Sequence, residues 1–524
     1  MAGADSDPHT RDPEGPARVL DACGEGKPYG RGDDDRPVPG RVGVVDIGSN
    51  TVRLVVYDVP TRLPIPIFNE KAQCALGAGL GQTGRLNPKG IDEARRSLLR
   101  FVRLARAMGI ERLELVATAA VRDAVDGPAF VARIEETCGF PVHVLSGAEE
   151  ARLAAVGLLN GTPNADGMLG DLGGGSLDLV SLEKGEVGRF ATLPGGHLRV
   201  GEESGGDRAK ARAILDERLA DVPWLKDIGG RTIFCVGGSW RALARVFIDQ
   251  THHPLHVVDN YTIGFFQARK LAELIASLSL NTLERLPGVA AARQQTLPFA
   301  AAALSALLHA AKPKEVVFSA YGMREGQMLE LLPTAMRRQD PLISACEMAA
   351  ERTSRFSISG AEMLDWLSPL FLQETPGERR LRLATCLLSD IGWSEHPDYR
   401  ALHAYHRVLR IPYPGLSHSD RAETALATLI RYGGNEDDHM AAPVRTLLDE
   451  RRLARARMTG LGLRLAHTLS GGAPGLLSQT RLRLTERTLT LDVPSDGAAF
   501  LSEAVERRFT RLARAIGVKP TFVA

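Results

Sequence analysis

Two stretches of the chain share one pattern: an apolar strand, a glycine-containing turn and a second apolar strand. They read GVVDIGSNTVRLVVYDV at 43–59 and GMLGDLGGGSLDLVSLE at 167–183, and the opening strand of each ends near an aspartate, Asp46 or Asp171. β-rich runs on both sides of a tight glycine turn predict a hairpin. Because two such hairpins occur in one chain, the pattern predicts an internal duplication.

The segments after the two hairpins also follow a common order. After the first, apolar periodicity predicts a strand at 65–76, a helix at 88–108, a strand at 113–118, a helix at 128–138, a strand at 141–145 and a helix from Ala148. After the second it predicts a strand at 187–193, a helix at 208–219, a strand at 232–236, a helix after Ser239, a strand at 315–319 and a helix from Arg324. Such repeated units predict an α/β fold, with subdomains at 41–160 and 161–333 around a ligand cleft.

The rest of the chain divides into three parts. Beyond Pro333 the strand patterns stop and amphipathic helical patterns continue to about residue 470, which predicts a separate all-α domain at 334–470. A strand pair at 482–484 and 489–493 and a basic helix at 498–515 predict a small α+β domain at 471–524. Residues 1–40 hold six Pro, seven Gly and nine acidic residues, a composition typical of a disordered tail.

Composition restricts the class of protein. The 524 residues carry a formal net charge of +1, and the six cysteines form no CxxC pair, so neither a zinc site nor a disulfide framework is indicated. The most apolar stretch, at 298–311, is too short to span a bilayer, and no secretory leader pattern opens the chain. We therefore expect a cytoplasmic protein that does not enter a membrane.

The C-terminal region is unusually basic. Residues 451–524 contain 13 Lys and Arg against 5 Asp and Glu. The arginines gather on two predicted helices, as Arg451, Arg452, Arg455 and Arg457 and as Arg507, Arg508, Arg511 and Arg514. A solvated face and a channel that attracts a long polyanion are both open interpretations. Nucleic acid is a weaker candidate, because no aromatic residue interleaves these arginines as a stacking platform.

The two turns carry residues suited to phosphate. Glycines allow the backbone N–H groups to approach phosphate oxygens, and a neighbouring aspartate can hold a metal ion that bridges them. The first turn offers Asp46, Gly48, Ser49, Asn50 and Thr51, and the second offers Asp171, Gly173, Gly174, Gly175 and Ser176. Arg53 follows on the next strand, where ligand binding and a solvated position are both open.

Further motifs identify a family. The hairpins DIGSNT and DLGGGS occur with TAAVRDA at 118–124, SGAEEARL at 146–153, VGGSW at 236–240 and MREG at 323–326. Together they resemble the exopolyphosphatase and guanosine pentaphosphate phosphohydrolase family, within the actin, sugar-kinase and heat-shock-ATPase superfamily. The resemblance runs from about Arg41 to the C-terminus, and it implies two ribonuclease-H/actin-like subdomains, a magnesium ion and a homodimer.

The resemblance also implies residue roles. Glu150 would activate the attacking water, Arg122 would contact phosphate, and Asp171 and Asp178 would hold Mg²⁺. The chemistry agrees, since phosphoanhydride hydrolysis needs a carboxylate beside the water and donors around the spreading negative charge. The plainer alternatives are an N-terminal acid stabilised by the helix dipole for Glu150 and a surface position for Arg122.

The all-α domain resembles the family's HD-like domain, whose metal site is built on a His-Asp pair. Here LLSDIGW at 387–393 aligns with that segment, and Ser389 stands before Asp390 where a histidine would be needed. A site built from Asp390 alone would be incomplete. We therefore expect this domain to serve a substrate channel or dimerisation instead of a second phosphohydrolase centre.

The sequence thus predicts a magnesium-dependent exopolyphosphatase that releases orthophosphate processively from inorganic polyphosphate, with Mn²⁺ or a monovalent cation as further ions to test. The first alternative is hydrolysis of guanosine pentaphosphate (pppGpp) by the same residues. A polyphosphate or nucleotide phosphotransferase and a non-enzymatic sensor are further alternatives. An intact SGAEEARL motif argues against both, because each would have no use for a residue that activates water.

Overall fold

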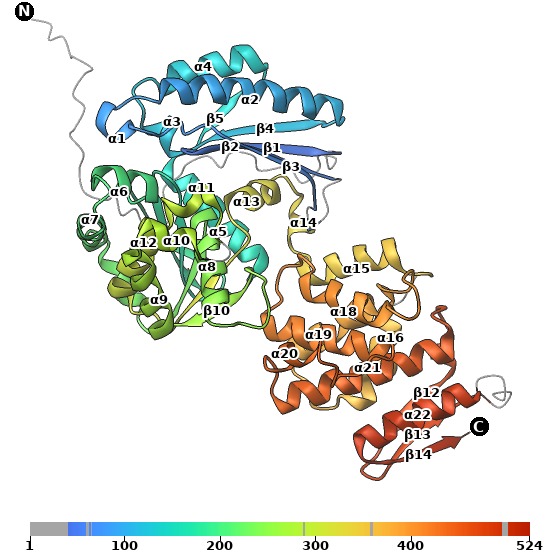
Figure 1. The fold of residues 1–524 in the computed structure, drawn as a ribbon. Coiled ribbons are helices and arrows are strands. Elements are labelled where there is room, and N and C mark those ends of the chain that lie inside the picture. Colours follow the sequence, from blue (N-terminus) through green and yellow to red (C-terminus); the bar gives the residue numbers. More distant parts are fainter. Residues whose placement is uncertain are drawn as a thin grey trace, which may run out of the picture. The chain divides into compact units, whose positions relative to one another are not determined.

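The computed structural model describes residues 40–58, 62–63, 65–286, 289–356, 360–494 and 501–523, so the expected tail lies almost wholly outside the described residues. The chain forms two compact units (Figure 1). The first contains the chain up to Gln250 together with Tyr261–Pro333, and the second contains Thr251–Asn260 and Thr334–Ala524. No described helix is long and apolar enough to cross a bilayer.

The first sheet contains the first predicted hairpin. Its strands are β1 (Val42–Ile47), β2 (Thr51–Tyr57), β3 (Pro66–Gln73), β4 (Arg112–Ala117) and β5 (Val142–Val144), in the order β3-β2-β1-β4-β5. β1 pairs antiparallel with β2 and parallel with β4. The helices α2 (Pro88–Ala107) and α4 (Gly127–Cys138) cover one face of this sheet (Figure 1). Their apolar stripes pack with the buried strand residues into one core.

The second sheet repeats this arrangement and adds one strand. β6 (Gly167–Leu172), β7 (Leu177–Glu183), β8 (Glu186–Leu193), β9 (Thr232–Val236), β10 (Tyr261–Gly264) and β11 (Glu315–Phe318) lie in the order β10-β11-β9-β6-β7-β8. β6 pairs antiparallel with β7 and parallel with β9, as β1 does with β2 and β4. The predicted duplication is therefore visible in the topology. The sequence pattern missed β10.

Helices fill the space around the second sheet. The longest are α5 (Gly147–Gly161), α7 (Arg208–Ala220), α8 (Gly238–Gln250), α9 (Phe265–Ser277) and α12 (Leu297–Ala311). α12 is buried along nearly all of its length, which explains why this helix is apolar on every side. The shorter helices of this unit are α1 (Leu80–Thr83), α3 (Ala119–Asp123), α6 (His197–Glu203), α10 (Leu280–Glu284), α11 (Ala291–Gln294), α13 (Met323–Glu330) and the 3₁₀ helix η1 (Pro223–Ile228).

Two helices that flank the cleft pack backbone against backbone. α5 and α13 make extensive contact, and glycines sit where they meet. A Cβ atom at Gly157 would overlap the carbonyl oxygen of Gly322, and a Cβ atom at Gly326 would overlap that of Leu153. Because each glycine faces main chain and not a movable side chain, no larger residue fits without separating the helices.

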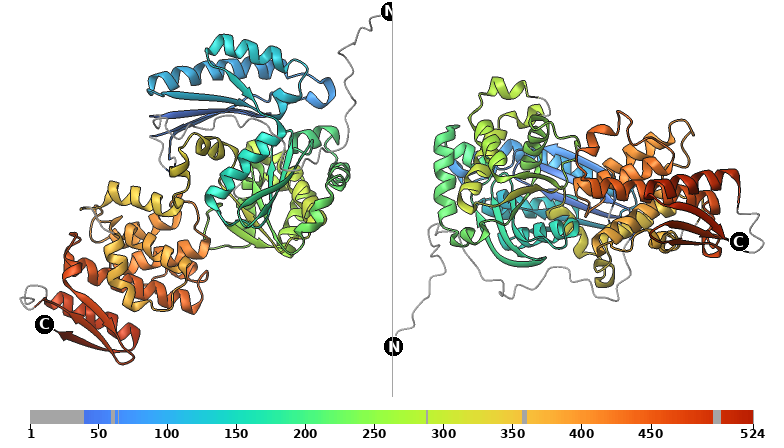
Figure 2. Two further views of the ribbon diagram at one scale, coloured as in Figure 1. Left: turned by 180° about the vertical axis from the view of Figure 1, so that it is seen from behind. Right: turned by 90° about the horizontal axis from the view of Figure 1, so that it is seen from below.

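The second unit is helical and ends in a small sheet. Its helices are α15 (Pro341–Thr353), α16 (Gly360–Leu367), α17 (Pro376–Leu387), α18 (Arg400–Arg410), α19 (His418–Arg431), α20 (Ala442–Arg445), α21 (Glu450–Ser470) and α22 (Glu503–Ile516), preceded by α14 (Thr334–Arg337). β12 (Arg481–Leu484), β13 (Thr488–Asp492) and β14 (Lys519–Val523) form the sheet, on which α22 packs (Figure 2). The sequence pattern predicted the first two strands and missed β14.

The segment expected to resemble an HD site contains a buried ion-pair network. Asp390 is fully buried and accepts hydrogen bonds from Arg355 at 3.0 and 3.2 Å and from Arg431 at 3.1 Å. The Ser389 hydroxyl lies 2.9 Å from Nε2 of His467. Burial, and then the two arginines, hold the pKa of His467 well below its ordinary value. This network engages Asp390 with two cations and so gives the acid a structural role in the helical core.

The α5–α13 contact yields a prediction. The Gly157→Ala variant should lose about 1–3 kcal/mol or more of unfolding free energy, because its methyl group has only main chain to displace. Gly81→Ala is the matched control: Gly81 is helical and exposed, and a Cβ atom there would have its nearest neighbours at 3.9 Å. Urea titrations of both variants measure the difference. Equal midpoints would contradict the packing argument.

Candidate functional site

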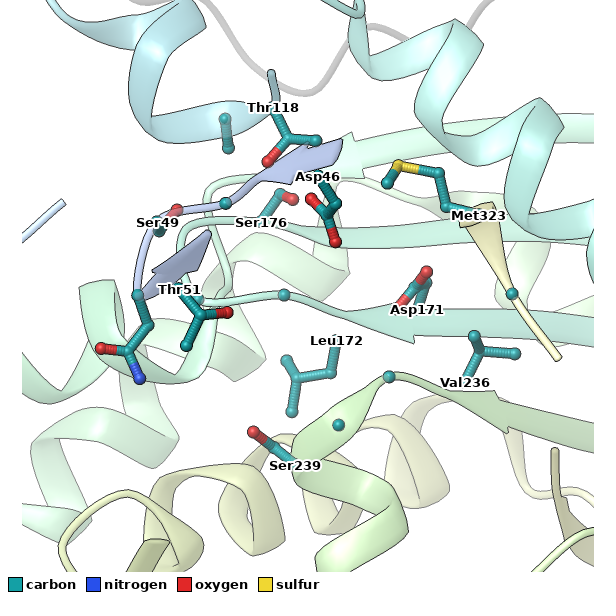
Figure 3. A pocket seen from close by; sticks show the side chains of 18 of the residues that line it. Asp46, Ser49, Thr51, Thr118, Asp171, Leu172, Ser176, Val236, Ser239 and Met323 are labelled. Atoms are coloured by element: carbon teal, nitrogen blue, oxygen red, sulfur yellow. The ribbon is translucent and has the colours of Figure 1, made fainter. Parts of the chain in front are cut away.

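One cavity in the first unit is lined from both hairpins (Figure 3). Most of the sequence-predicted site residues line it: Asp46, Gly48, Ser49, Asn50, Thr51, Glu150, Asp171, Gly173, Gly174, Gly175 and Ser176. Arg122 and Asp178 are not among the described lining residues and lie next to it, in contact with residues that are. The fold therefore gathers into one place residues that are far apart in sequence.

The two turns have the same local geometry. The amide of Gly48 donates to the carbonyl oxygen of Thr51 at 3.0 Å, and the amide of Gly173 donates to that of Ser176 at 3.0 Å. The strands continue this correspondence, since Asp46 faces Arg53 across the first hairpin and Asp171 faces Asp178 across the second. The duplicated hairpins thus differ at one charged position, where the first carries a cation and the second an acid.

In both turns the carbonyl oxygens are hydrogen-bonded within the protein, whereas backbone amides at the tip are left without a protein acceptor among the described residues. The carbonyl oxygens of Ser49 and Asn50 accept hydrogen bonds from the amides of Gly77, Cys74 and Ala75, and those of Gly173 and Gly174 accept from the first amides of α6. Among the described residues, the amides of Ser49, Asn50, Gly174 and Gly175 donate to no protein acceptor. Unpaired amides beside a cavity form a cradle for an anion.

The two turns approach each other closely where their glycines meet. A Cβ atom at Gly174 would lie 3.1 Å from the Cβ of Ser49, and one at Gly175 would lie 3.2 Å from the Oγ of Ser49. Gly237 lies in a third turn, that of the VGGSW motif at 236–240. It has φ +105° and leaves room for only a hydrogen atom beside Oδ1 of Asp171. These close contacts keep the three turns around a single space.

Glu150, the second glutamate of SGAEEARL, enters the cavity from the first turn of α5. Ser146 caps this helix and bonds Glu149 in a reciprocal capping box, at 2.9 Å from the Ser146 amide to the Glu149 carboxylate. Glu149 is thereby turned toward the cap, as expected for a neighbour on another helix face, and Glu150 lines the cavity. Glu149 thus belongs to the helix cap, whereas Glu150, which also lies in the first turn near the positive end of the helix dipole, lines the cavity.

Arg122 holds the Glu150 carboxylate. Its Nη1 donates to Oε2 of Glu150 at 3.1 Å and to the carbonyl oxygen of Leu145 at 2.9 Å. Asp123 lies 3.4 Å from Nε of Arg122 and accepts a 2.7 Å hydrogen bond from Arg199 of α6. Burial, and then the charge of Asp178, raise the pKa of Glu150 well above its ordinary value. Glu150 is consequently a stronger proton acceptor than a solvated glutamate.

Three aspartates share this environment. Burial raises the pKa of Asp46; burial and then Asp178 raise the pKa of Asp171 to about 7; and burial raises the pKa of Asp178 to about 6. Ser176 donates to Oδ2 of Asp178 at 3.0 Å, and Thr192 and Ser176 partly counter the effect of burial on the pKa of this carboxyl. Buried carboxylates that repel one another fit a hard divalent cation.

The protein itself supplies few ligands for such a cation. No group of three or more His, Cys, Asp or Glu in the described part of the chain is arranged to bind a metal. Mg²⁺ commonly takes one or two carboxylates and completes its shell with water and substrate phosphates. Asp46 and Asp171 enter the cavity from opposite hairpins and are the acids best placed for this (Figure 3). The pairing of Asp171 with Asp178 as metal ligands stays a prediction.

Five cationic side chains line the same cavity: Arg53, Lys71, Arg241, Arg293 and Arg324. Burial, and then the charge of Arg324, lower the pKa of Arg241 to about 10, and burial followed by Arg293 lowers that of Lys71. Arg324 lies 3.9 Å from Asp46. Sequence reasoning singled out only Arg53; Arg324 lies within the quoted MREG motif, whereas the other three gave no local signal.

His197 and Arg293, which gave no sequence signal, support the glycine turns. Nδ1 of His197 lies 2.8 Å from the carbonyl oxygen of Gly173, and Nε2 lies 3.2 Å from Oγ of Ser239. Arg293 donates to the same hydroxyl at 2.8 Å. Burial, and then Arg293, lower the pKa of His197 to about 4, so this ring is neutral near pH 7. A lone histidine in PGGHLRV carries no motif that would have identified it.

The basic residues predicted as a channel lie in the second unit and fall into two groups. Arg451 pairs with Glu378 at 2.9 Å, Arg452 with Asp420 at 2.9 Å, and Arg455 with Glu423 at 3.1 Å. These three arginines of α21 are therefore neutralised locally. Arg507, Arg508 and Arg511 lie on α22 beside a separate groove.

The fold and the cavity define a class of protein. Two duplicated α/β subdomains with glycine turns around a polar cleft are the actin-like arrangement, and the free amides, buried acids and clustered cations specify a site for phosphate groups. Comparison with protein families agrees. Residues 55–335 match the Ppx/GppA phosphatase family, and residues 342–523 match the exopolyphosphatase C-terminal domain. The chain belongs to the Ppx/GppA phosphatase family, whose members are phosphatases.

Solved structures show the same fold in the N-terminal half. One is an exopolyphosphatase-like protein, 22% identical over 56% of this chain and 97% of its own, with a TM-score of 0.50. Another is an exopolyphosphatase from Cytophaga hutchinsonii ATCC 33406, also 22% identical, over 55% of this chain and 96% of its own, with a TM-score of 0.50. At this identity the similarity concerns the fold alone.

The buried acids lead to a prediction about stability. In the presence of a chelator at pH 8, Asp178→Asn should stabilise the protein by on the order of 2 kcal/mol, because folding no longer buries a charged carboxylate. A carboxyl whose pKa is raised in the folded state destabilises the fold at pH values above that pKa. The advantage of the variant should therefore fade as the pH falls from about 6 toward the ordinary pKa of 3.8. Urea unfolding measures it, with exposed Asp92→Asn as the control. A variant less stable than wild type at pH 8 would contradict this account.

Proposed function

We propose that this phosphatase is a magnesium-dependent exopolyphosphatase, which removes terminal orthophosphate from inorganic polyphosphate. The observation that carries the proposal is the convergence of four unpaired turn amides, five cations and Glu150 on one cavity. The cations lower one another's pKa values, so a multiply charged anion relieves their repulsion. Such a lining suits a chain of phosphates better than an apolar or singly charged substrate.

The chain's own residues account for each part of the hydrolysis. The turn amides and the lining cations bind the terminal phosphate and orient its phosphorus toward Glu150. Arg122 occupies Oε2 of Glu150, which leaves Oε1 to accept a proton from water. The water oxygen forms a bond to the terminal phosphorus while the bridging P–O bond breaks. The proton goes to Glu150, and the departing oxygen remains on the shortened chain.

A bound Mg²⁺ would neutralise charge on the terminal phosphates and so assist the departure of the shortened chain. Asp171, with Asp46 or Asp178, would hold it. Arg122 contacts Glu150 in this structure, so its expected contact with phosphate is part of the proposal. No covalent intermediate on the protein is required, because the nucleophile is water.

The polymer is favoured over pppGpp by two considerations. The second half of the chain matches a domain named for exopolyphosphatases. The glycine turn of the VGGSW motif at 236–240 meets a guanidinium: a Cβ atom at Gly238 would lie 2.9 Å from Nη2 of Arg293. A charged group at that place supports binding of further phosphates more than binding of a base.

The function is tested with two substrates. Phosphate release is measured with Mg²⁺ from long-chain polyphosphate and from pppGpp at matched concentrations of terminal phosphate. We expect a kcat/KM at least tenfold higher for the polymer. A preference for pppGpp would instead show that the protein is a nucleotide phosphohydrolase. The absence of phosphate release from both substrates would contradict the proposed hydrolysis.

The proposed base is tested by substitution. Glu150→Gln should lower kcat for polyphosphate by roughly 10²–10⁴-fold with little change in KM, because the amide keeps the shape and loses the proton acceptor. Glu149→Gln is the matched control, since Glu149 belongs to the helix cap; it should retain kcat and lose at most about 1 kcal/mol of stability. Equal kcat values in the two variants would remove Glu150 from the mechanism.

A further inference from the structure

Arg122, which holds Glu150, is itself held by Asp123. Oδ1 of Asp123 lies 3.4 Å from Nε of Arg122, and Oδ2 accepts a 2.7 Å hydrogen bond from Nη2 of Arg199. Asp123 follows Arg122 on α3, whereas Arg199 lies on α6. A continuous series of contacts therefore begins at Arg199 and ends at the carboxylate of Glu150. Neither Asp123 nor Arg199 is among the described residues that line the cavity, so both act on the site through other residues.

The contacts of Arg122 fix its guanidinium on two edges. Nη1 donates to Oε2 of Glu150 and to the carbonyl oxygen of Leu145, and Nε faces Asp123. Arginine and a carboxylate commonly form two parallel hydrogen bonds. Such a pair would occupy both oxygens of Glu150, including the Oε1 that is to accept a proton from water. Asp123 attracts the Nε edge and so favours the observed contact, in which Arg122 binds a single oxygen of Glu150.

The helix α6 joins Arg199 to the second glycine turn. The amide of His197 donates to the carbonyl oxygen of Gly173 at 3.2 Å, and the amides of Leu198 and Arg199 donate to that of Gly174 at 3.0 and 3.1 Å. Gly174 also carries one of the amides that have no protein acceptor among the described residues. The backbone of Arg199 thus contacts the turn that is to bind phosphate, while its side chain reaches Asp123.

The contact between Arg199 and Asp123 joins the two subdomains, since Asp123 belongs to 41–160 and Arg199 to 161–333. A second contact supports it, because Glu202 of α6 accepts hydrogen bonds from the amide of Gly79 at 3.1 and 3.2 Å. The side chains of Arg199 and Asp123 are 18% and 32% exposed, so water screens this ion pair less than one on the open surface. The position of the phosphate turn and the orientation of Arg122 therefore depend on each other.

We propose that Asp123 and Arg199 are positioning residues for the hydrolysis. They hold Arg122 in the orientation in which it binds one oxygen of Glu150, and they tie that orientation to the second glycine turn. The inference rests on the proposed function, because it concerns the part that Arg122 and Glu150 take in that reaction.

A purely electrostatic role is the competing explanation, and it makes a different prediction. Neutralising Asp123 would remove a negative charge near the site and so favour an anionic substrate, whereas neutralising Arg199 would remove a positive charge and disfavour it. Positioning predicts losses in the same direction, because either change releases Arg122. The two substitutions therefore separate the explanations.

The test compares kcat and KM for Asp123→Asn, Arg199→Gln and the double variant. The substrate is whichever of long-chain polyphosphate and pppGpp the wild type hydrolyses faster. The matched controls are Asp166→Asn and Arg231→Gln. Asp166 and Arg231 also form a 2.7 Å pair, 48% and 25% exposed, where β6 and β9 begin, at the ends of these strands opposite the glycine turns. Urea midpoints of all variants show how much each ion pair contributes to stability.

We expect Asp123→Asn and Arg199→Gln each to lower kcat roughly 10- to 100-fold with little change in KM, because a misplaced catalytic group slows the reaction without weakening binding. The double variant should be no slower than the slower single variant, since both residues act through Arg122. Arg199→Lys keeps a charged donor and should recover most of kcat. The control variants should keep kcat at a similar loss of stability.

Opposite changes of activity in Asp123→Asn and Arg199→Gln would overturn the inference in favour of the electrostatic role. Losses that multiply in the double variant, or an equal loss of kcat in the controls, would also overturn it. Normal release of phosphate by the wild type and by all variants would overturn the inference alone. Absence of release by the wild type from both substrates would overturn the proposed function and the inference with it.

Discussion

The contact between α5 and α13 is the constraint on which the site depends. α5 leaves the first sheet, carries Glu150 at its first turn and packs against the second sheet, whereas α13 carries Arg324 to the other side of the cavity. Glycine at 157 and 326 lets the two helices touch through their backbones, so their relative position is fixed by main chain. Glu150 and the cation that faces Asp46 are thereby placed by the rigid parts of the fold.

Placing these side chains together is electrostatically unfavourable. The acids lie near one another and have raised pKa values, and four of the five lining cations have lowered pKa values, all but Arg324. The Arg122–Glu150 pair and the Arg324–Asp46 pair offset part of this cost. Under the proposed function, binding of phosphate and a divalent cation would relieve the remainder, so the site would gain affinity for its ligands at the expense of stability in their absence.

The sequence predicted the elements with strong periodicity and the residues within motifs. The hairpins, α2 and α5 follow patterns long enough to be read directly, and glycine turns with flanking aspartates are specific enough to predict a phosphate site. The strands β10 and β14 were missed; β14 contains Pro520, and a proline within a run argues against a strand. Lys71, Arg241 and Arg293 were missed because only the tertiary fold brings them to the cavity. The expected homodimer stays a prediction.

The central claim is that water, activated by Glu150, takes the terminal phosphate directly. Its most direct test is a single turnover of polyphosphate in water labelled with heavy oxygen, followed by mass spectrometry of the released orthophosphate. The account predicts that every released phosphate contains one solvent oxygen. Unlabelled phosphate, or a terminal phosphate recovered on an acceptor molecule, would contradict it and establish phosphotransfer.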